Sequence, residues 1–492
     1  MDFAAIGKIF TSYDSKAPML FNSGAFFFLF IFFLLIYSMV YKVKMARTIY
    51  VIAFSLFFYY KASGWYLLLL VGSAVADYLF AIMVSRSKEE WLRKLWLVVS
   101  IVFSLGLLAY FKYTNFFVIN WNAITGSNFS ISEIFLPIGI SFYTFQSLSY
   151  IIDVYWKKID VTNNFGDYLF FLTFFPHLVA GPIVKAKLFL PQLKEEVIIK
   201  REEVYMGLYL IICGLLKKSV LADYVSQYSD LVFADPGHYS GFENLMAAYC
   251  YALQIYCDFS GYSDMAIGLA KIMGFNLGVN FNFPYQAQSI TDFWRRWHIA
   301  LSTWLRDYLY IPLGGNKKGR IRTYINSFIT MLLGGLWHGA SWKFVFWGGM
   351  HGVGLAVHKL FDHKFGNIKI EKNWQKSILK ILAWALTFHF VIFLWIFFRA
   401  KDFSVAWSMV HQIVFNMDLA FVSPFFSARK LLIIILIFGI ITHAVSSETN
   451  QRLMKQFVGI PFWAKLAIFV VSVQLAIQFT NESVQPFIYF QF

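Results

Sequence analysis

Residues 323–342 read TYINSFITMLLGGLWHGASW, and no Asp, Glu, Lys or Arg interrupts them. About 20 such residues are enough to cross a bilayer as a helix. One ionisable side chain, His338, lies near the end of the stretch. Because an ionisable group inside a membrane is costly, it marks a functional site by default. The stretch therefore predicts a membrane helix that carries a functional histidine.

Four positions of this stretch recur every four residues: Asn326, Thr330, Gly334 and His338. That spacing places them on one face of a helix. The face is small and polar, so we expect it to turn toward protein or water rather than toward lipid. A histidine that is merely held by an interhelical hydrogen bond is the competing interpretation.

The rest of the chain has the composition of a polytopic membrane protein. Of its 492 residues, 59% are hydrophobic, 21% are aromatic and only 14% are charged, whereas a soluble domain carries about 25% charged residues. We expect an all-α fold with roughly ten to thirteen membrane-embedded helices, some of them re-entrant. No low-complexity linker divides the sequence, so residues 1–492 are predicted to form one integral-membrane domain.

The distribution of charge predicts an orientation in the membrane. The net charge is +15, but basic residues cluster in loops, as they do on the cytoplasmic side of membrane proteins, so nucleic acid is not an expected partner. Residues 113–156 and 219–270 contain no Lys or Arg, whereas residues 295–322 are rich in both. The positive-inside rule then places residues 295–322 in the cytosol and the two basic-free stretches outside. Membrane lipids are the expected surroundings.

The cytosolic stretch begins with a pattern typical of an amphipathic helix. Apolar side chains repeat at three- and four-residue intervals over residues 293–308. Thr291 is the expected N-cap, and Asp292 and Arg296 can pair one turn apart. His298 falls within the predicted helix. A membrane-surface helix with basic anchors explains the same pattern without any chemistry.

Several common catalytic signatures are absent from the sequence. There is no P-loop, no H-E-x-x-H and no G-x-S-x-G. We expect no metal site, because His358 and His363 have no further ligands beside them. His298 and His338 remain, both among Arg and Trp residues. A neutral histidine is the usual general base at cellular pH, so the two are candidate catalytic residues.

Seven segments spread over most of the chain carry a more specific signal. They are LPIGISFYTFQ at 136–146, FPHLVAGPIV at 175–184, DFSGYSDMAIG at 258–268, DFWRRWH at 292–298, WLRDYLYIPLGG at 304–315, LWHGASW at 336–342 and FIYFQF at 487–492. With these segments the chain resembles the membrane-bound O-acyltransferase family, in its bacterial branch similar to alginate O-acetylases. The resemblance implies a helical fold around a central tunnel, with an acyl donor entering from the cytosol and an acceptor approaching from outside.

The resemblance also implies roles for individual residues. His338 matches the family's catalytic histidine, and His298 matches its second functional histidine. The implied reaction moves an acetyl group from acetyl-coenzyme A, as a substrate and not a bound cofactor, to hydroxyls of an envelope polysaccharide or peptidoglycan. The implied location is the bacterial cytoplasmic (inner) membrane, with an extracytoplasmic acyltransferase as partner. Basic side chains of the cytosolic stretch are candidate contacts for the coenzyme A phosphates or, equally, positive-inside anchors; they are Arg295, Arg296, Lys317 and Lys318.

Three questions stay open on the sequence. Acyl transfer can be direct, with His338 as base, or can pass through a covalent acyl intermediate. His298 can orient the donor or stabilise an oxyanion. Alternative activities are D-alanyl transfer from a carrier protein to teichoic acid and, in a different class, proton-coupled transport with His338 as a relay.

Overall fold

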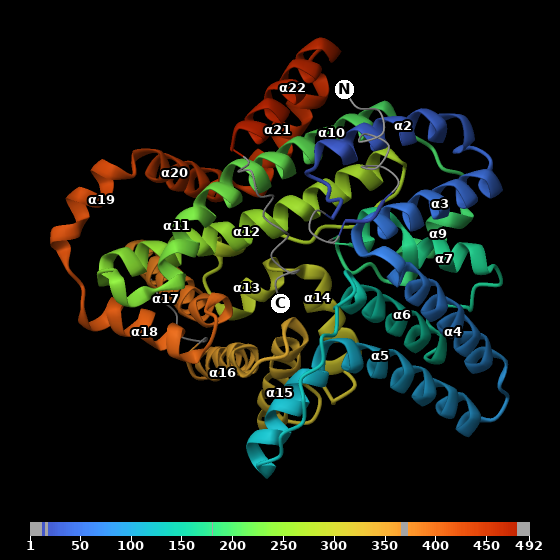
Figure 1. Cartoon of the computed structure of the whole chain (residues 1–492), viewed down its shortest axis with the longest axis horizontal. Coiled ribbons are helices and arrows are strands. Elements are labelled where there is room, and N and C mark those ends of the chain that lie inside the picture. The colour runs from blue at the N-terminus through green and yellow to red at the C-terminus, as the bar shows by residue number, and fades with distance from the viewer. Residues whose placement is uncertain (1–11, 15–17, 180, 366–371, 480–492) are drawn as a thin grey trace. The chain divides into compact units, whose positions relative to one another are not determined.

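The computed structural model of the protein describes residues 12–14, 18–179, 181–365 and 372–479. Within these residues every regular element is a helix (Figure 1), which confirms the all-α prediction. Of the seven segments quoted above, the last, at residues 487–492, lies outside the described residues.

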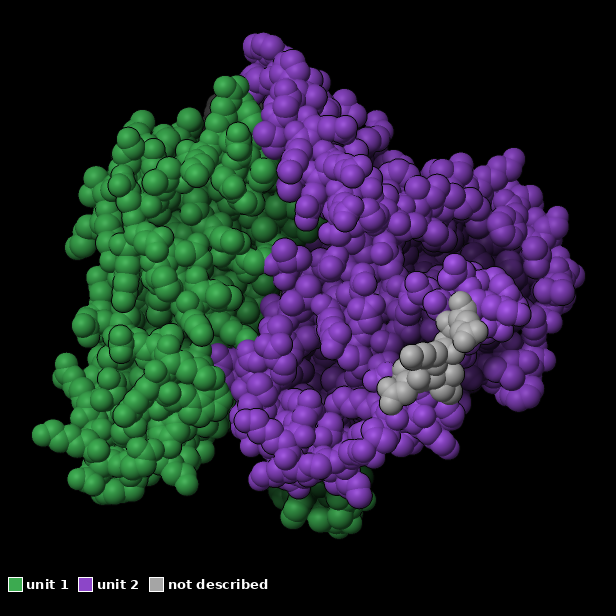
Figure 2. Space-filling view, turned by 180° about the vertical axis from the view of Figure 1, so that it is seen from behind, with its two compact units in different colours: residues 1–211, 262–278 green, residues 212–261, 279–492 purple. Residues whose placement is uncertain are grey.

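The chain packs as two compact units, coloured green and purple in Figure 2. Unit 1 comprises residues 1–211 and 262–278, and unit 2 comprises residues 212–261 and 279–492. Helices α10 (Arg201–Leu215) and α12 (Gly241–Ile272) each contribute residues to both units. That residues 1–492 act as one domain therefore stays a prediction.

The remaining helices belong to one unit each. Unit 1 contains α2 (Gly24–Val40), α3 (Lys44–Ser63), η1 (Gly64–Tyr66), α4 (Leu67–Arg86), α5 (Glu90–Thr125), α6 (Ile140–Tyr155), α7 (Phe165–Thr173), α8 (Phe175–Leu178) and α9 (Ala186–Lys194). Unit 2 contains η2 (Leu216–Ala222), α11 (Asp223–Ala234), η3 (Pro236–His238), η4 (Pro284–Gln286), α13 (Ile290–Arg296), α14 (Ile299–Leu305), η5 (Arg306–Tyr310), α15 (Arg320–His338), α16 (Trp342–Phe365), α17 (Asn373–Arg399), α18 (Phe403–Phe415), η6 (Leu419–Phe421), α19 (Val422–Ala428), α20 (Lys430–Ala444), α21 (Ser447–Gly459) and α22 (Phe462–Phe479).

Among the described residues, 5 helical segments are long and apolar enough to cross a membrane, or up to 7 if two bent pairs each count as one span. They are Lys44–Arg86, Glu90–Thr125, Arg201–Ala234, Asn373–Arg399 and Phe462–Phe479. This supports a multi-pass membrane protein. How many shorter helices also enter the membrane, and hence the total of ten to thirteen, stays a prediction.

Residues 323–338 of the predicted stretch lie in one helix, and a break follows before Trp342. Helix α15 ends at His338, the backbone of Gly339 is extended, and α16 starts at Trp342. Helix α15 begins among basic residues and is not among the segments that are apolar enough to pass as a complete span. The predicted helix is therefore confirmed over residues 323–338, and its place in the membrane stays a prediction.

Helices α15 and α16 lie side by side as a tight hairpin (Figure 1). Their backbones touch at Gly335 and Gly348: a Cβ atom at either position would overlap a carbonyl oxygen of the other helix. Small residues allow this close approach, which is common between membrane helices. The hairpin therefore fixes the position and direction of the last turn of α15, where His338 lies.

The amphipathic helix predicted over residues 293–308 is also broken. Helix α13 ends at Arg296, α14 begins at Ile299, and His298 between them has the left-handed conformation (φ 42°, ψ 56°). The side chain of Ser289, not Thr291, caps α13. The predicted pair of Asp292 and Arg296 does form, with the Arg296 Nε 2.9 Å from the carboxylate.

Candidate active site

His338 is the last residue of α15, and its side chain is 3% exposed. The other three positions of the predicted face, Asn326, Thr330 and Gly334, are buried as well, which confirms that this face turns into the protein. The Asn326 amide donates a hydrogen bond to the carbonyl of Gly315 (3.1 Å) and so ties α15 to the turn that precedes it. His338 lies in the last turn of α15, where the helix dipole places partial negative charge.

Three aromatic rings surround the imidazole of His338, each meeting it at a steep angle. The ring centres of Trp337, Trp347 and Phe398 lie 5.0, 5.1 and 5.4 Å from that of His338. They come from α15, α16 and α17. The rings keep the histidine in a dry environment, where electrostatic interactions with a reacting group are strong.

His298 is fully buried, and Asn280 holds it at the break between α13 and α14. The Asn280 side-chain oxygen accepts the backbone N–H of Ala300 (3.2 Å) and lies 3.1 Å from His298 Nδ1. The Asn280 carbonyl also accepts the N–H of Ile299 (2.8 Å). A non-glycine residue in the left-handed region costs about 1–3 kcal/mol and persists only where its surroundings hold it, often at functional sites.

The contacts of Asn280 also determine the tautomer of His298. The Asn280 atom that accepts from the backbone of Ala300 must be the amide oxygen, so His298 Nδ1 donates to it. In the neutral ring Nε2 therefore carries the lone pair. Burial lowers the pKa of His298 to about 3, so the ring is neutral at cellular pH. Its Nε2 is then a hydrogen-bond acceptor.

One ring of α12 and one of α15 contact His298. Phe259 packs edge-on against the imidazole, with ring centres 4.6 Å apart, and Trp337 lies 6.4 Å away. Phe259 follows Asp258, which forms a buried ion pair with Lys218 (2.6 Å). The DFSGYSD segment therefore has a structural role, because the buried Asp258 carboxylate anchors the turn of α12 that packs on His298.

Trp337 brings the two predicted histidines together. Its ring centre lies 5.0 Å from that of His338 and 6.4 Å from that of His298, so the two imidazoles are no farther apart than the sum of these distances. Both belong to unit 2. The structure thus gathers into one site two residues that lie 40 positions apart in the chain, one at the end of α15 and one at the break between α13 and α14.

Two hydrogen-bond donors were not predicted from the sequence: Trp347, whose ring packs on His338, and His351, whose ring packs on Trp347. The Trp294 indole donates to Nδ1 of His351 (3.3 Å), so the proton of neutral His351 is on Nε2. That Nε2 and the indole nitrogen of Trp347 are buried, and neither has a partner within the described part of the chain. The two rings are 4.6 Å apart. A sequence signal exists for His351: it lies in GGMHG, where Gly348 and Gly352 pack closely on α15.

The four basic candidates lie outside this dry site. Arg295 and Arg296 form the last turn of α13, and Lys317 and Lys318 follow η5. Arg295 and both lysines are exposed, whereas Arg296 is half-buried and paired with Asp292. Their part in binding a donor stays a prediction.

Comparison with known proteins agrees with the motifs. Residues 157–367, which include both histidines, match the model of the membrane-bound O-acyltransferase family. The peptidoglycan O-acetyltransferase of Helicobacter pylori is 37% identical over 429 residues, 80% of each chain. A protein of Pseudomonas aeruginosa named "probable alginate O-acetylase" is 42% identical over 80% of this chain and 74% of its own length.

A more distant relative is the teichoic acid D-alanyltransferase of Bacillus subtilis. It is 30% identical over 277 residues, which are 54% of this chain and 69% of that protein. These relatives are transferases of acyl groups, and two of them cover most of this chain at well above 30% identity. The chain therefore belongs to the membrane-bound O-acyltransferase family, and it is an O-acyltransferase rather than a proton-coupled transporter.

Proposed function

We propose that this protein transfers an acetyl group from cytosolic acetyl-coenzyme A to hydroxyls of an envelope polysaccharide or peptidoglycan, directly or through an extracytoplasmic acyltransferase. It does so as one multi-pass domain, residues 1–492, of the bacterial cytoplasmic membrane. One observation carries the proposal: two buried histidines contact the same ring, Trp337, inside an O-acyltransferase. The relatives named for peptidoglycan and alginate support the class of acceptor.

In this mechanism His338 is the general base. It takes the proton of the incoming hydroxyl while the oxygen attacks the thioester carbonyl carbon. The carbon–sulfur bond then breaks, and the leaving thiolate takes the proton from the imidazolium. The position of His338 at the C-terminus of α15 stabilises the imidazolium between these two steps.

The other polar groups of the site have distinct roles. Trp347 and His351 present buried N–H groups without partners in the described residues, which suits an oxygen that gains negative charge at the tetrahedral stage. His298 offers an acceptor at Nε2, which suits orientation of a hydroxyl. Of the two roles open for His298, its tautomer favours orientation over stabilisation of an oxyanion.

The proposed acyl donor rests on the exposed basic residues and on the relatives. Arg295, Lys317 and Lys318 are exposed on the stretch predicted to face the cytosol, where they can meet the phosphates of coenzyme A. D-alanyl transfer from a carrier protein is the second candidate, supported by the relative of Bacillus subtilis. We place it second because that relative is less similar and matches less of the chain than the acetylases do.

The test is transfer of label from radiolabelled acetyl-coenzyme A by the purified full-length protein. Wild type is compared with His338→Ala and with His363→Ala, a matched control because His363 is an exposed histidine on α16. We expect turnover in wild type and in the control but not in His338→Ala. Label that stays on the protein would identify a covalent route. Turnover in His338→Ala would overturn the role of this histidine, and turnover with an aminoacylated carrier protein alone would favour the D-alanyl reaction.

A further inference from the structure

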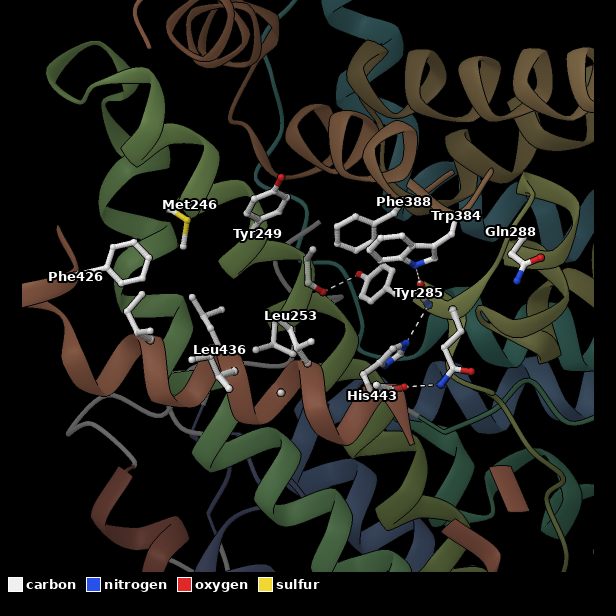
Figure 3. Close-up of a pocket in the computed structure, with 17 residues that line it drawn as sticks. Met246, Tyr249, Leu253, Tyr285, Gln288, Trp384, Phe388, Phe426, Leu436 and His443 are labelled. Atoms are coloured by element: carbon white, nitrogen blue, oxygen red, sulfur yellow. Dashed lines mark hydrogen bonds between the residues drawn. The ribbon is translucent and has the colours of Figure 1, made fainter. Parts of the chain in front are cut away.

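A cavity of about 720 Å³ lies in unit 2, lined by residues of α12, α17, α19 and α20 and by the segment around η4. This volume is typical of a ligand site. Helix α20 forms one long side of it (Figure 3). Met246 and Phe426 lie at one end of the cavity, and Tyr285 and Trp384 lie toward the other. The cavity is therefore elongated along α20.

The polar side chains at the Tyr285 end donate their hydrogen bonds to the protein itself. The Tyr285 hydroxyl donates to the carbonyl of Ala252 (2.7 Å), and the Trp384 indole donates to the carbonyl of Tyr285 (2.8 Å). The Gln286 amide donates to the carbonyl of His443 (2.6 Å). Because these donors have partners within the protein and most of the other lining residues are apolar, the interior of the cavity suits a hydrocarbon.

The rim of the cavity opens on a surface that faces lipid. Ile437 and Ile440 of α20 line the cavity and are 51% and 67% exposed. Helix α17, which carries Trp384, is long and apolar enough to cross a membrane, and α20 belongs to one of the bent pairs. Apolar side chains exposed on such helices contact hydrocarbon. Membrane lipid therefore has direct access to the cavity.

The length of the cavity matches one acyl chain of a phospholipid. Ile433 and His443, which line it near its two ends, are 10 positions apart in the chain, and this corresponds to about 15 Å of helix. One acyl chain fills half the hydrocarbon core of a bilayer, which is also about 15 Å. A chain that enters at the Phe426 end therefore reaches the Tyr285 end.

Two cations lie at the Phe426 end of the cavity. Arg429 follows Phe426 by three residues and precedes Ile433 by four, and both of these neighbours line the cavity. Its guanidinium packs over the ring of Tyr228 (4.6 Å), and no carboxylate pairs with it in the part of the chain that the structure describes. Lys430, the next residue, is exposed. Basic sites beside membrane helices attract the phosphates of lipid head groups.

We propose that this cavity binds one phospholipid, with its phosphate beside Arg429 and an acyl chain lying along α20 toward the Tyr285 end. The tip of the chain then lies beside Tyr285, whose hydroxyl accepts a hydrogen bond from Trp395 (3.2 Å). Trp395 stacks on Trp347 (5.7 Å), one of the rings around His338. The bound lipid thus packs behind the aromatic rings that surround the candidate catalytic histidine.

The direction of the chain is tested with brominated phosphatidylglycerol, because bromine quenches tryptophan fluorescence on contact. The bromine is placed either near the glycerol or near the methyl end of the acyl chains. Full-length protein in detergent micelles is titrated with each lipid beside Trp384→Phe, and the difference is the quenching of Trp384, which lines the cavity. We expect this difference to saturate and to be larger for bromine near the methyl end. Quenching that does not saturate, or that is stronger for bromine near the glycerol, would overturn the proposal.

Two matched variants test the position of the phosphate. Arg429→Gln should raise the half-saturating lipid concentration by about fivefold, which corresponds to about 1 kcal/mol. Arg452→Gln makes the same change of charge at an exposed residue of α21 and should leave that concentration unchanged. A wild-type value in Arg429→Gln, or equal effects of the two variants, would overturn the phosphate site.

A probe without phosphate separates the head group from the chain. Diacylglycerol with the same brominated chains should bind wild type about fivefold more weakly than phosphatidylglycerol does. It should bind Arg429→Gln as it binds wild type, because it has no phosphate for Arg429 to contact. Equal binding of the two lipids to wild type would contradict the proposed phosphate contact.

Discussion

His338 and His298 are both buried and both contact Trp337, but their backbones differ. His338 ends a regular helix whose face of small and polar residues is visible in the sequence. His298 lies at a helix break in the left-handed conformation, held by Asn280 from 18 positions away. The difference suits two tasks. A base needs a position that tolerates a positive charge, whereas an orienting acceptor needs a ring locked in one tautomer and one direction.

The largest expected effect is the difference in transfer rate when each of the two histidines is replaced by glutamine. Glutamine at 338 cannot take up a proton, so His338→Gln should lower the rate of acetyl transfer by about 10²–10⁴-fold. Glutamine at 298 still offers one donor and one acceptor, so His298→Gln should keep a measurable fraction of the rate. The measurement is the initial rate with radiolabelled acetyl-coenzyme A. Equal losses in the two variants would remove the distinction between base and orienting residue.

The next effect concerns the donors around His338. Trp347→Phe keeps an aromatic ring but removes the indole N–H, and we expect a loss of about 10²-fold in kcat, the size found for one oxyanion donor. Trp407→Phe is the control, since Trp407 is an exposed tryptophan of the same unit. If both variants retain the wild-type kcat, Trp347 only packs against His338 and does not act on the reacting oxygen.

A smaller effect should follow when the Asn280 side chain, which stabilises the helix break at His298, is removed. Asn280→Ala leaves His298 Nδ1 and the Ala300 N–H without their acceptor, which costs about 1–3 kcal/mol of stability. We expect a lower unfolding midpoint together with slower transfer. Asn282→Ala, two residues away, changes an exposed side chain and should alter neither quantity. A stable but inactive Asn280→Ala protein would mean that Asn280 acts on the substrate and not on His298.

The smallest expected effect is on pH dependence. His298 has a pKa of about 3 in the folded protein, below the ordinary value of about 6.5. The unfolded chain therefore binds a proton that the folded one does not, and stability falls as the pH drops below about 6.5. His298→Gln should flatten this decline in unfolding midpoints measured from about pH 7 to about pH 5. An identical decline in wild type and variant would assign acid sensitivity to other groups.

The contrast between the two histidines also explains what the sequence could predict. The period of four residues from Asn326 to His338 appears in the structure because a regular helix preserves such spacing. The prediction of one helix over residues 293–308 is wrong because Asn280, a partner distant in sequence, stabilises a break that no local sequence pattern indicates. His351 escaped notice for a related reason: its importance lies in the hydrogen bond from Trp294, which only the packing of α13 on α16 reveals.

In the proposed mechanism His338 and His298 act as one unit on the same hydroxyl. The most direct test is the rate of acetyl transfer in His338→Ala, His298→Ala and the double variant. If both histidines serve one proton transfer, the double variant should be about as slow as His338→Ala alone, because residues that act together are not additive. If the two losses instead multiply, the histidines act independently, and the proposed mechanism is wrong.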